Sequence, residues 1–218
     1  MIEYNIGDIN ESRILNYLKE QIKTVLSENK ICNICVSGGS TPKNTLIELS
    51  KENINWKKVC FFQTDERVVS HISKHSNFKN ILSYFKENEI KIFPMYNGLH
   101  TKKSVINYQN YLDDNLLKNK NYSFDILILG FGTDGHIASI FPQNDVCSFE
   151  TKNLFITKNK KNGFKRISMK MNILKTSNKT IIISYGQEKF KVLKNQKLNL
   201  PVHQFISNNN QVTWFYKI

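Results

Sequence analysis

The most constraining feature of this sequence is an unbroken run of four large aliphatic residues, 126–129 (Ile-Leu-Ile-Leu), that leads into a glycine-rich segment. The run shows no alternation between apolar and polar residues, which is typical of a parallel strand covered on both faces. Gly130, Gly132 and Gly135 follow, and glycine lets the backbone turn sharply and pass close to a ligand. The segment therefore predicts a buried strand whose carboxyl end opens into a loop suited to ligand binding.

Predicted helices and strands alternate along the rest of the chain. Apolar residues at helical spacing indicate helices, and short apolar runs between polar or glycine-rich segments indicate strands. We expect helices at 9–28, 42–50, 77–86, 104–117 and 187–195, and strands at 31–36, 59–63, 90–93, 125–129, 166–171, 179–185 and 211–216. This alternation predicts an α/β fold in which a mostly parallel sheet is covered by helices on both faces.

Length and composition indicate an ordinary globular protein. The 218 residues fit one domain, 1–218, with 40% hydrophobic and 22% charged residues. No apolar run approaches the roughly 18 residues of a membrane span, and residues 1–13 lack the apolar centre of a signal peptide. Cys32 and Cys35 form a C-x-x-C pattern within a strand-like run, where residues three apart point to opposite faces. We therefore expect structural, reduced cysteines, no metal site and a cytoplasmic location.

The chain carries a formal net charge of +13, from 31 basic and 18 acidic residues. Such an excess is compatible with a basic nucleic-acid-binding module, which stays as one alternative. The lysines are spread along the whole chain without a dense basic arm, however, and this favours an ordinary solvated surface. Only three of the basic residues are arginines, Arg13, Arg67 and Arg166. In so lysine-rich a chain, Arg67 and Arg166 indicate sites that need a planar guanidinium with several donors.

The segment 36–42 joins a predicted strand to a predicted helix through two glycines. Ser40 or Thr41 can cap that helix, and Pro42 suits its first position. Unpaired N–H groups at a helix N-terminus form a natural phosphate site, although a tight turn with an ordinary cap is the alternative interpretation. The segment is neither a Walker loop nor a dinucleotide-binding motif. We expect Gly39, Ser40 and Thr41 to bind a phosphate group.

Titratable residues follow other strands at the edge where open α/β sheets bind ligands. Asp134 and His136 follow the aliphatic run, and Asp65 and Arg67 follow the predicted strand 59–63. An ion pair that merely holds a loop is the alternative for the second pair. Lys189 lies in the first turn of a predicted helix, where its charge opposes the helix dipole and favours a bound anion.

These segments together resemble the motifs of the 6-phosphogluconolactonase family, in the family's order, at 36–42, 64–67 with 76–77, 125–142, and 166–168 with 186–189. The resemblance spans roughly residues 30 to 190. Its longest part is the Leu-Gly-x-Gly-x-Asp-Gly-His-x-Ala-Ser-x-Phe-Pro signature that residues 129–142 meet. The resemblance implies a Rossmann-like fold and the hydrolysis of 6-phospho-D-glucono-1,5-lactone to 6-phospho-D-gluconate, in the oxidative pentose phosphate pathway.

Glucosamine-6-phosphate deaminases are similar to the same segments and form a second alternative. They resemble this chain at the Asp-Gly-His step but continue to Phe-Asn-Glu-Pro, whose Glu assists ring opening. Here Phe141 stands in that position, and Arg67 stands where the deaminases tend to carry Tyr. Both differences favour the lactonase.

Lactone hydrolysis needs a water made nucleophilic near neutral pH, and histidine is the side chain best suited to take its proton. We assign His136 as the general base and then as the proton donor to the departing ring oxygen. Asp134 is expected to orient the site or to bind a sugar hydroxyl. Arg67 or loop N–H groups are expected to stabilise the oxyanion.

The remaining predicted residues bind substrate. The phosphate is expected on the 39–41 turn, flanked by Arg166 and Lys189, with Asp65 contacting sugar hydroxyls. We expect no cofactor and no metal, since Asp134 and His136 alone do not make a metal site. The expected partner is a small sugar phosphate lactone, with no nucleic acid or membrane, and a monomer is favoured.

Overall fold

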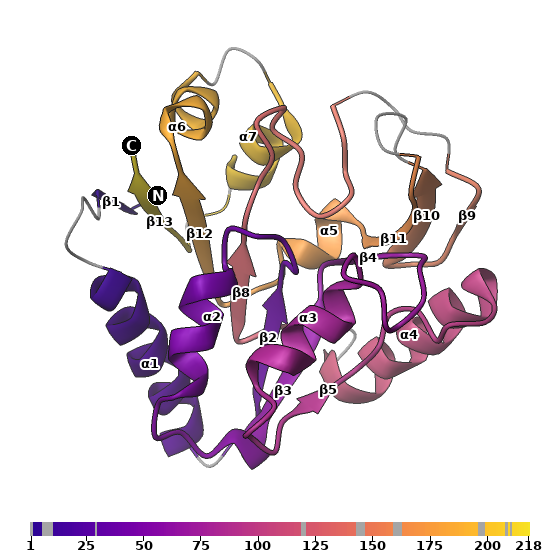
Figure 1. Ribbon diagram of the computed structural model, residues 1–218, viewed down its shortest axis with the longest axis horizontal. Helices are drawn as coiled ribbons and strands as arrows, with labels where there is room; N and C mark the ends of the chain where they lie inside the picture. The colour runs from indigo at the N-terminus through magenta and orange to yellow at the C-terminus, as the bar shows by residue number, and fades with distance from the viewer. Residues whose placement is uncertain are drawn as a thin grey trace.

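The computed structural model describes residues 2–5, 11–28, 30–118, 121–142, 147–158, 163–195, 199–207, 209 and 211–218. Its main sheet contains seven strands, and every neighbouring pair is parallel. In spatial order they are β1 (Ile2–Asn5), β13 (Val212–Lys217), β12 (Lys179–Tyr185), β8 (Ile126–Leu129), β2 (Cys32–Val36), β3 (Val59–Gln63) and β5 (Lys91–Ile92). The predicted α/β fold with a mostly parallel sheet is confirmed (Figure 1).

The order of the strands reverses beside the aliphatic run. The chain runs outward from β2 through β3 to β5, returns to β8 on the other side of β2, and then continues to β12 and β13. Loops that leave β2 and β8 therefore diverge to opposite faces, and the crevice between them is where such sheets bind ligands. All four residues of β8 are buried, as its lack of alternation predicts.

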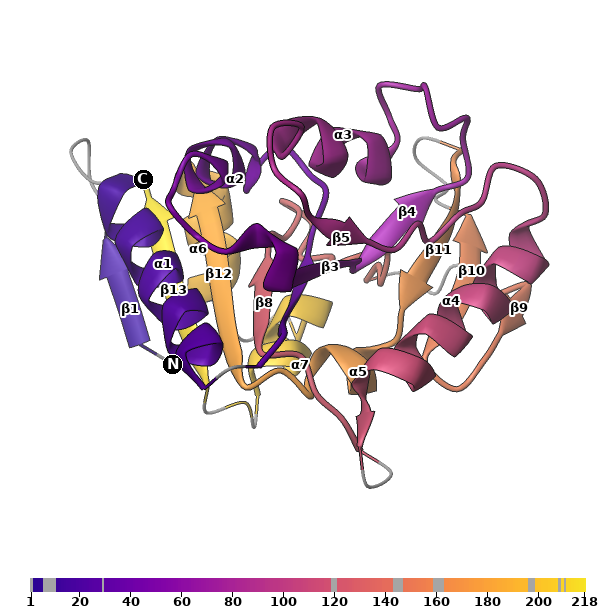
Figure 2. The same ribbon diagram turned by 90° about the horizontal axis from the view of Figure 1, so that it is seen from below.

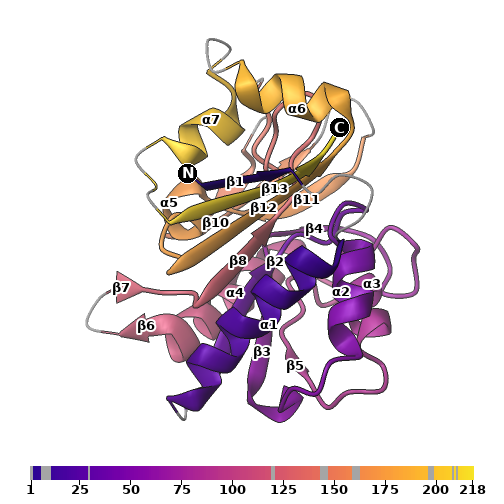
Figure 3. The same ribbon diagram turned by 90° about the vertical axis from the view of Figure 1, so that its left-hand side faces the viewer.

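Two layers of helices cover the sheet, because alternate residues of each strand point to opposite faces. Ile126 and Ile128 pack with α1 (Glu11–Ser27), α2 (Lys43–Ser50) and α3 (Asn77–Tyr84). Leu127 and Leu129 pack into the other cluster, with α4 (Thr101–Leu116), α5 (Met171–Leu174), α6 (Gln187–Lys194) and α7 (Pro201–Ile206). Figure 3 shows α1 and α2 on one side of the sheet and α6 and α7 on the other.

A second, antiparallel sheet differs from the predicted alternation. It consists of β4 (Asp65–Arg67), β11 (Lys165–Met169), β10 (Leu154–Lys158) and β9 (Phe149–Glu150). The strand expected at 166–171 is β11 and belongs here, not beside the parallel strands. Figure 2 shows this sheet next to α4, extending the molecule beyond β5. Its strand β4 follows β3 after one residue, so it carries the chain from the edge of the main sheet across to β11.

Other elements had no clear sequence signal. They are β1, β9, β10, α5, α7, a short 3₁₀ turn at Trp56–Lys58, and a small hairpin of β6 (Leu117–Lys118) and β7 (Asn121–Tyr122). Across the part of the chain that the structure describes, no helix combines the length and apolar character needed to cross a membrane.

Candidate active site

A pocket of about 230 Å³ lies at the carboxyl ends of β2 and β8. The strands that meet there are tied together by Ser37, whose hydroxyl accepts hydrogen bonds from Gly130 N at 3.4 Å and Thr64 Oγ1 at 3.3 Å. The lining residues are Ser37, Gly39, Ser40, Thr41, Pro42, Asp65, Arg67, Asn77, Gly130, Phe131, Gly132, His136, Ala138, Arg166 and Lys189. Eight of the nine predicted site residues are among them, and the ninth, Asp134, contacts His136.

His136 is held by Asp134 in a tight loop after β8. Asp134 Oδ1 lies 2.5 Å from His136 Nδ1 and accepts a further hydrogen bond from the His136 main-chain N at 3.2 Å. A Cβ atom at Gly132 would overlap both side chains, so only glycine allows this arrangement. With the Asp134 carboxylate ionised, Nδ1 carries the hydrogen and Nε2 keeps its lone pair.

The environment of Asp134 favours its ionised form. Burial alone would raise the pKa of the Asp134 carboxyl, but electrostatic attraction to His136 and the hydrogen bonds from His136 outweigh it, and the pKa lies below its ordinary value. The His136 ring also packs against Phe141, with ring centroids 4.8 Å apart. The imidazole therefore has an oriented tautomer and an aromatic support, which are the requirements of a fixed general base.

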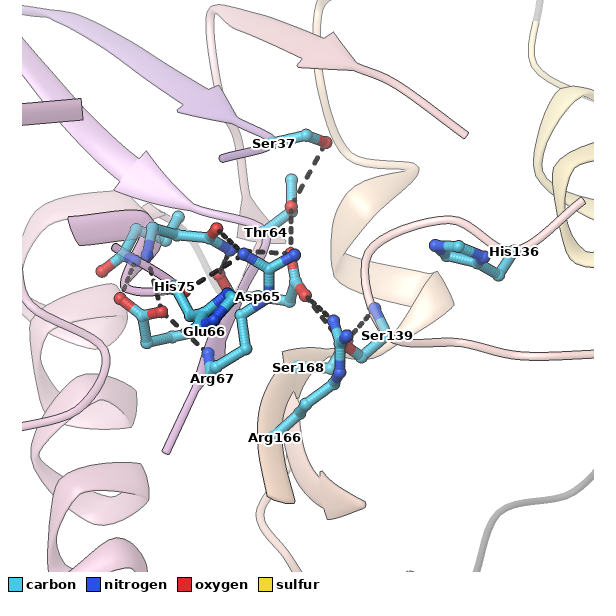
Figure 4. Close-up of polar contacts among 12 residues, drawn as sticks. Ser37, Thr64, Asp65, Glu66, Arg67, His75, His136, Ser139, Arg166 and Ser168 are labelled. Carbon is cyan, nitrogen blue, oxygen red and sulfur yellow. Dashed lines mark hydrogen bonds and ion pairs between the residues drawn. The ribbon is translucent and has the colours of Figure 1, made fainter. Parts of the chain in front are cut away.

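The pairing of β4 with β11 brings four polar side chains to one face. Arg67 lies opposite Arg166, and Asp65 lies opposite Ser168. Because opposite and alternate residues of an antiparallel pair share a face, all four project together. Figure 4 shows this group around Asp65, with the His136 ring to one side of it.

Arg166 is buried, with only 5% of its surface exposed. Its Nη1 lies 3.4 Å from Asp65 Oδ2 and 3.4 Å from Ser139 Oγ, and Ser139 Oγ donates to Asp65 Oδ2 at 2.6 Å. The guanidinium carbon lies 5.6 Å from the Phe141 ring centroid. The Asp65 carboxylate therefore accepts hydrogen bonds from neighbouring side chains, an arrangement suited to holding Arg166 in place.

Arg67 reaches the pocket from the neighbouring strand. Its Nη1 donates to the His75 main-chain O at 3.1 Å and to Asn77 Oδ1 at 2.9 Å. Asn77 also lines the pocket. The sequence marks Asn77 only as the residue after Ser76 in a family-like motif and gives it no role.

The N-terminus of α2 lies at the same pocket, but its cap differs from the prediction. Pro42 is the N-cap, and no side chain caps the helix, so the expectation that Ser40 or Thr41 does so is wrong. The Thr41 hydroxyl instead accepts a hydrogen bond from Lys189 Nζ at 2.8 Å. Gly186, with a φ of 90°, is the N-cap of α6, and Lys189 in the first turn of this helix reaches the 39–41 segment.

Lys189 is a partly buried cation. Burial lowers the pKa of its ammonium group. Arg67, Arg166 and Lys189 together give the pocket three basic side chains, so an anion is the ligand that this pocket favours.

Ser139, Asn77 and Phe141 are functional candidates without a role predicted from sequence. Ser139 and Phe141 lie inside the 125–142 signature, and only their contacts with Asp65, Arg166 and His136 reveal what they do. Among the described residues, no group of three or more His, Cys, Asp or Glu side chains is placed to hold a metal ion.

Known proteins of similar sequence indicate the family of this chain. A family model described as glucosamine-6-phosphate isomerases/6-phosphogluconolactonase matches residues 10–214. A probable 6-phosphogluconolactonase from Dictyostelium discoideum is 33% identical over 92% of this chain and 90% of its own length. A 6-phosphogluconolactonase from Helicobacter pylori is 30% identical over 96% of this chain and 93% of its own.

Solved structures share the fold. The crystal structure of a 6-phosphogluconolactonase from Thermotoga maritima superposes with a TM-score of 0.87 at 24% identity, covering 100% of this chain and 99% of that one. The match of the family model over nearly all of the chain, together with relatives of similar length, establishes that the chain belongs to the glucosamine-6-phosphate isomerase/6-phosphogluconolactonase family.

Proposed function

We propose that this protein is a 6-phosphogluconolactonase, a carboxylic ester hydrolase of the oxidative pentose phosphate pathway. It hydrolyses 6-phospho-D-glucono-1,5-lactone to 6-phospho-D-gluconate. The observation that carries the proposal is one pocket that combines a carboxylate-oriented imidazole with three basic side chains. The names of its relatives support the same reaction.

His136 activates the attacking water. Its Nε2 lone pair takes a proton as the water oxygen bonds to the lactone carbonyl carbon, and the carbonyl becomes a tetrahedral oxyanion. Asp134, 2.5 Å from Nδ1, stabilises the imidazolium that forms. When the bond from this carbon to the ring oxygen breaks, His136 returns the proton to that oxygen, and the product is the open-chain acid.

Arg67 is the side chain best placed to stabilise the oxyanion. It lines the pocket with His136, and its hydrogen bonds to His75 O and Asn77 Oδ1 use donors of one terminal nitrogen, Nη1. A guanidinium has five donors, so others stay available for the developing charge. Fixed donors of this kind need no rearrangement during the reaction.

The phosphate binds between the 39–41 turn, Arg166 and Lys189. The positive end of α2 and the two cations favour an anion there, and Arg166 and Lys189 supply charge-assisted hydrogen bonds that fix one end of the substrate. Asp65 has two roles in this proposal. It contacts the sugar hydroxyls, as predicted, and it also holds Arg166 in place for the phosphate.

The contacts of Phe141 favour lactone hydrolysis over the ring opening of an amino sugar. This position presents an aromatic ring to His136 and Arg166 instead of a carboxylate.

We also keep a cytoplasmic location within the proposal, because Cys32, Cys35, Cys60 and Cys147 are all free thiols, as expected in a reducing compartment.

The proposal is tested by following acid release from freshly generated 6-phosphogluconolactone, corrected for spontaneous hydrolysis. We expect acceleration by the wild-type protein and only weak acceleration with unphosphorylated gluconolactone. His136→Ala should abolish turnover while the affinity for 6-phosphogluconate is retained. Turnover that is unchanged in this variant would overturn the assignment of the base, and equal rates on both lactones would overturn the phosphate site.

A further inference from the structure

Asn77 connects the two arginines of the pocket. Its Oδ1 accepts a hydrogen bond from Arg67 Nη1 at 2.9 Å, and its Nδ2 donates to the Asp65 main-chain O at 2.8 Å and to Asp65 Oδ1 at 3.4 Å. Asp65 Oδ2 in turn pairs with Arg166. One side-chain amide therefore joins Arg67 to Arg166 through Asp65, and Figure 4 shows these three labelled side chains as one connected group.

We propose that Asn77 is a positioning residue that sets both arginines for the reaction. The inference rests on the proposed function for its kinetic consequences. Asn77 is itself 1% exposed, so it acts mainly through the side chains it holds.

The backbone of Asn77 is fixed by a buried carboxylate. Glu66 Oε1 accepts from Asn77 N at 2.8 Å, and Glu66 Oε2 accepts from Phe78 N at 2.8 Å, at the first two residues of α3. Ser76 caps the same helix by accepting from Lys79 N at 3.2 Å. The first turn of α3 is thus anchored behind the pocket.

The side chain of Asn77 is fixed from the other side by Gly38. A Cβ atom at Gly38 would overlap the Asn77 side chain, so the loop after β2 and the amide pack in direct contact. With its backbone anchored and its side chain packed, Asn77 holds one orientation. An orienting residue needs this rigidity to transmit a geometry to its partners.

Only an amide meets both of its partners. Arg67 offers donors and needs an acceptor, whereas Asp65 offers acceptors and needs a donor. A carboxylate in the same place would satisfy Arg67 but repel Asp65, and an apolar side chain would satisfy neither. This asymmetry allows the two connections to be broken separately.

The first experiment compares Asn77→Asp with Asn77→Ala in the lactone assay. Asn77→Asp keeps an acceptor for Arg67 and disturbs Asp65 and Arg166, so KM should rise about tenfold while kcat stays within about threefold. Asn77→Ala removes both connections, so kcat/KM should fall about 10- to 100-fold, the usual scale for a residue that orients a functional group. Asn80→Ala, in the same helix with its amide donating to Lys74 O outside the pocket, should stay within about twofold of wild type.

The second experiment is a double-mutant cycle. In an Arg67→Ala background, Asn77→Ala should lower kcat by less than a further factor of about three, because its partner Arg67 is gone, while the rise in KM that acts through Asp65 and Arg166 should remain. An equal effect of Asn77→Ala in the wild-type, Arg67→Ala and Arg166→Ala backgrounds would overturn the inference. So would equal losses of kcat in Asn77→Asp and Asn77→Ala.

The same double-mutant cycle, measured as free energies of unfolding in urea, separates this inference from the proposed function. Coupling between Asn77 and Arg67 in the free energy of unfolding does not depend on any reaction. If the wild-type protein fails to hydrolyse the lactone, the proposed function fails, while coupled unfolding still supports the positioning role. Strictly additive unfolding free energies refute the positioning role whatever the activity.

Discussion

Replacement of Asp134 by asparagine removes the charge beside His136 and keeps the shape of the side chain. We expect kcat for 6-phosphogluconolactone to fall about 30-fold. The physical reason is that His136 becomes positively charged when it takes the proton from water, and the Asp134 carboxylate is the acid in contact with its Nδ1. The lost stabilisation therefore belongs to the transition state and appears in kcat.

The magnitude follows from the geometry of the pair. Opposite charges centred about 4 Å apart attract by about 4 kcal/mol at an effective dielectric constant of about 20. The side chains of His136 and Asp134 are 30% and 40% exposed, so solvent screening lowers this attraction to about 2 kcal/mol. A loss of about 2 kcal/mol corresponds to about 30-fold in rate. The asparagine oxygen can still accept from Nδ1, which is why the loss should stay below that of His136→Ala.

The assay measures kcat and KM by acid release across a range of pH. Because the pKa of Asp134 lies below its ordinary value, its carboxylate is ionised over the whole working range, and the loss in Asp134→Asn should be present throughout it. Asp113→Asn is the matched control, since Asp113 accepts from Gln109 and Tyr122 away from the pocket, and its kcat should stay within about twofold. A kcat for Asp134→Asn within twofold of wild type would refute the role given to the pair.

Three further predictions concern other parts of the pocket. Gly38→Ala should displace Asn77, lower kcat/KM about tenfold and lower the free energy of unfolding in urea by about 1–3 kcal/mol. At Gly39 an added Cβ would have no atom within 4 Å, so the free energy of unfolding of Gly39→Ala should stay within about 0.5 kcal/mol of wild type. Equal losses of stability in the two variants would contradict the close packing at Gly38. Burial lowers the pKa of Lys189. The calorimetric affinity for 6-phosphogluconate should therefore fall as pH rises through that lowered pKa, at a pH below the ordinary lysine pKa. Lys189→Arg should hold its affinity over the same pH range, because its guanidinium stays charged. Parallel affinity profiles for wild type and Lys189→Arg would show that Lys189 does not bind the phosphate. The same pKa shift should make the free energy of unfolding of the unliganded protein rise with pH, from the lowered pKa up to the ordinary lysine pKa, because the unfolded chain binds more protons there.

The parallel sheet could be predicted because its signal is local. A strand that is buried on both faces is mostly apolar, and residues 126–129 and 59–62 carry that pattern within a few positions. The predicted bounds of β3 and β12 match the structure, those of β8 differ by one residue at the start, and those of β13 differ by one residue at each end. Helix ends were less accurate, as at α3, which stops at Tyr84 before the expected Lys86.

The antiparallel sheet could not be predicted because its pairing is not local. The strand β4 has three residues, two acidic and one basic, and its partner Arg166 lies about a hundred positions along the chain from Arg67. No periodicity in either segment indicates this register. The residue types of the site were accessible from glycines and from the rarity of arginine, but the contacts of Asp65 with Arg166 and Ser139 depend on that register.

The direct opposition of Arg67 and Arg166 across β4 and β11 affects how the protein behaves without its substrate. Like charges directly opposite each other in a sheet repel. The Asp65 carboxylate forms an ion pair with one of the two arginines, Arg166. An incoming phosphate relieves the repulsion, so ligand binding and resistance to unfolding rise together. At a free metabolite concentration of one hundred times Kd, the gain is about 2.7 kcal/mol. The heat tolerance of the protein, and with it its survival against proteolysis, should therefore track the supply of the sugar phosphate on which it acts.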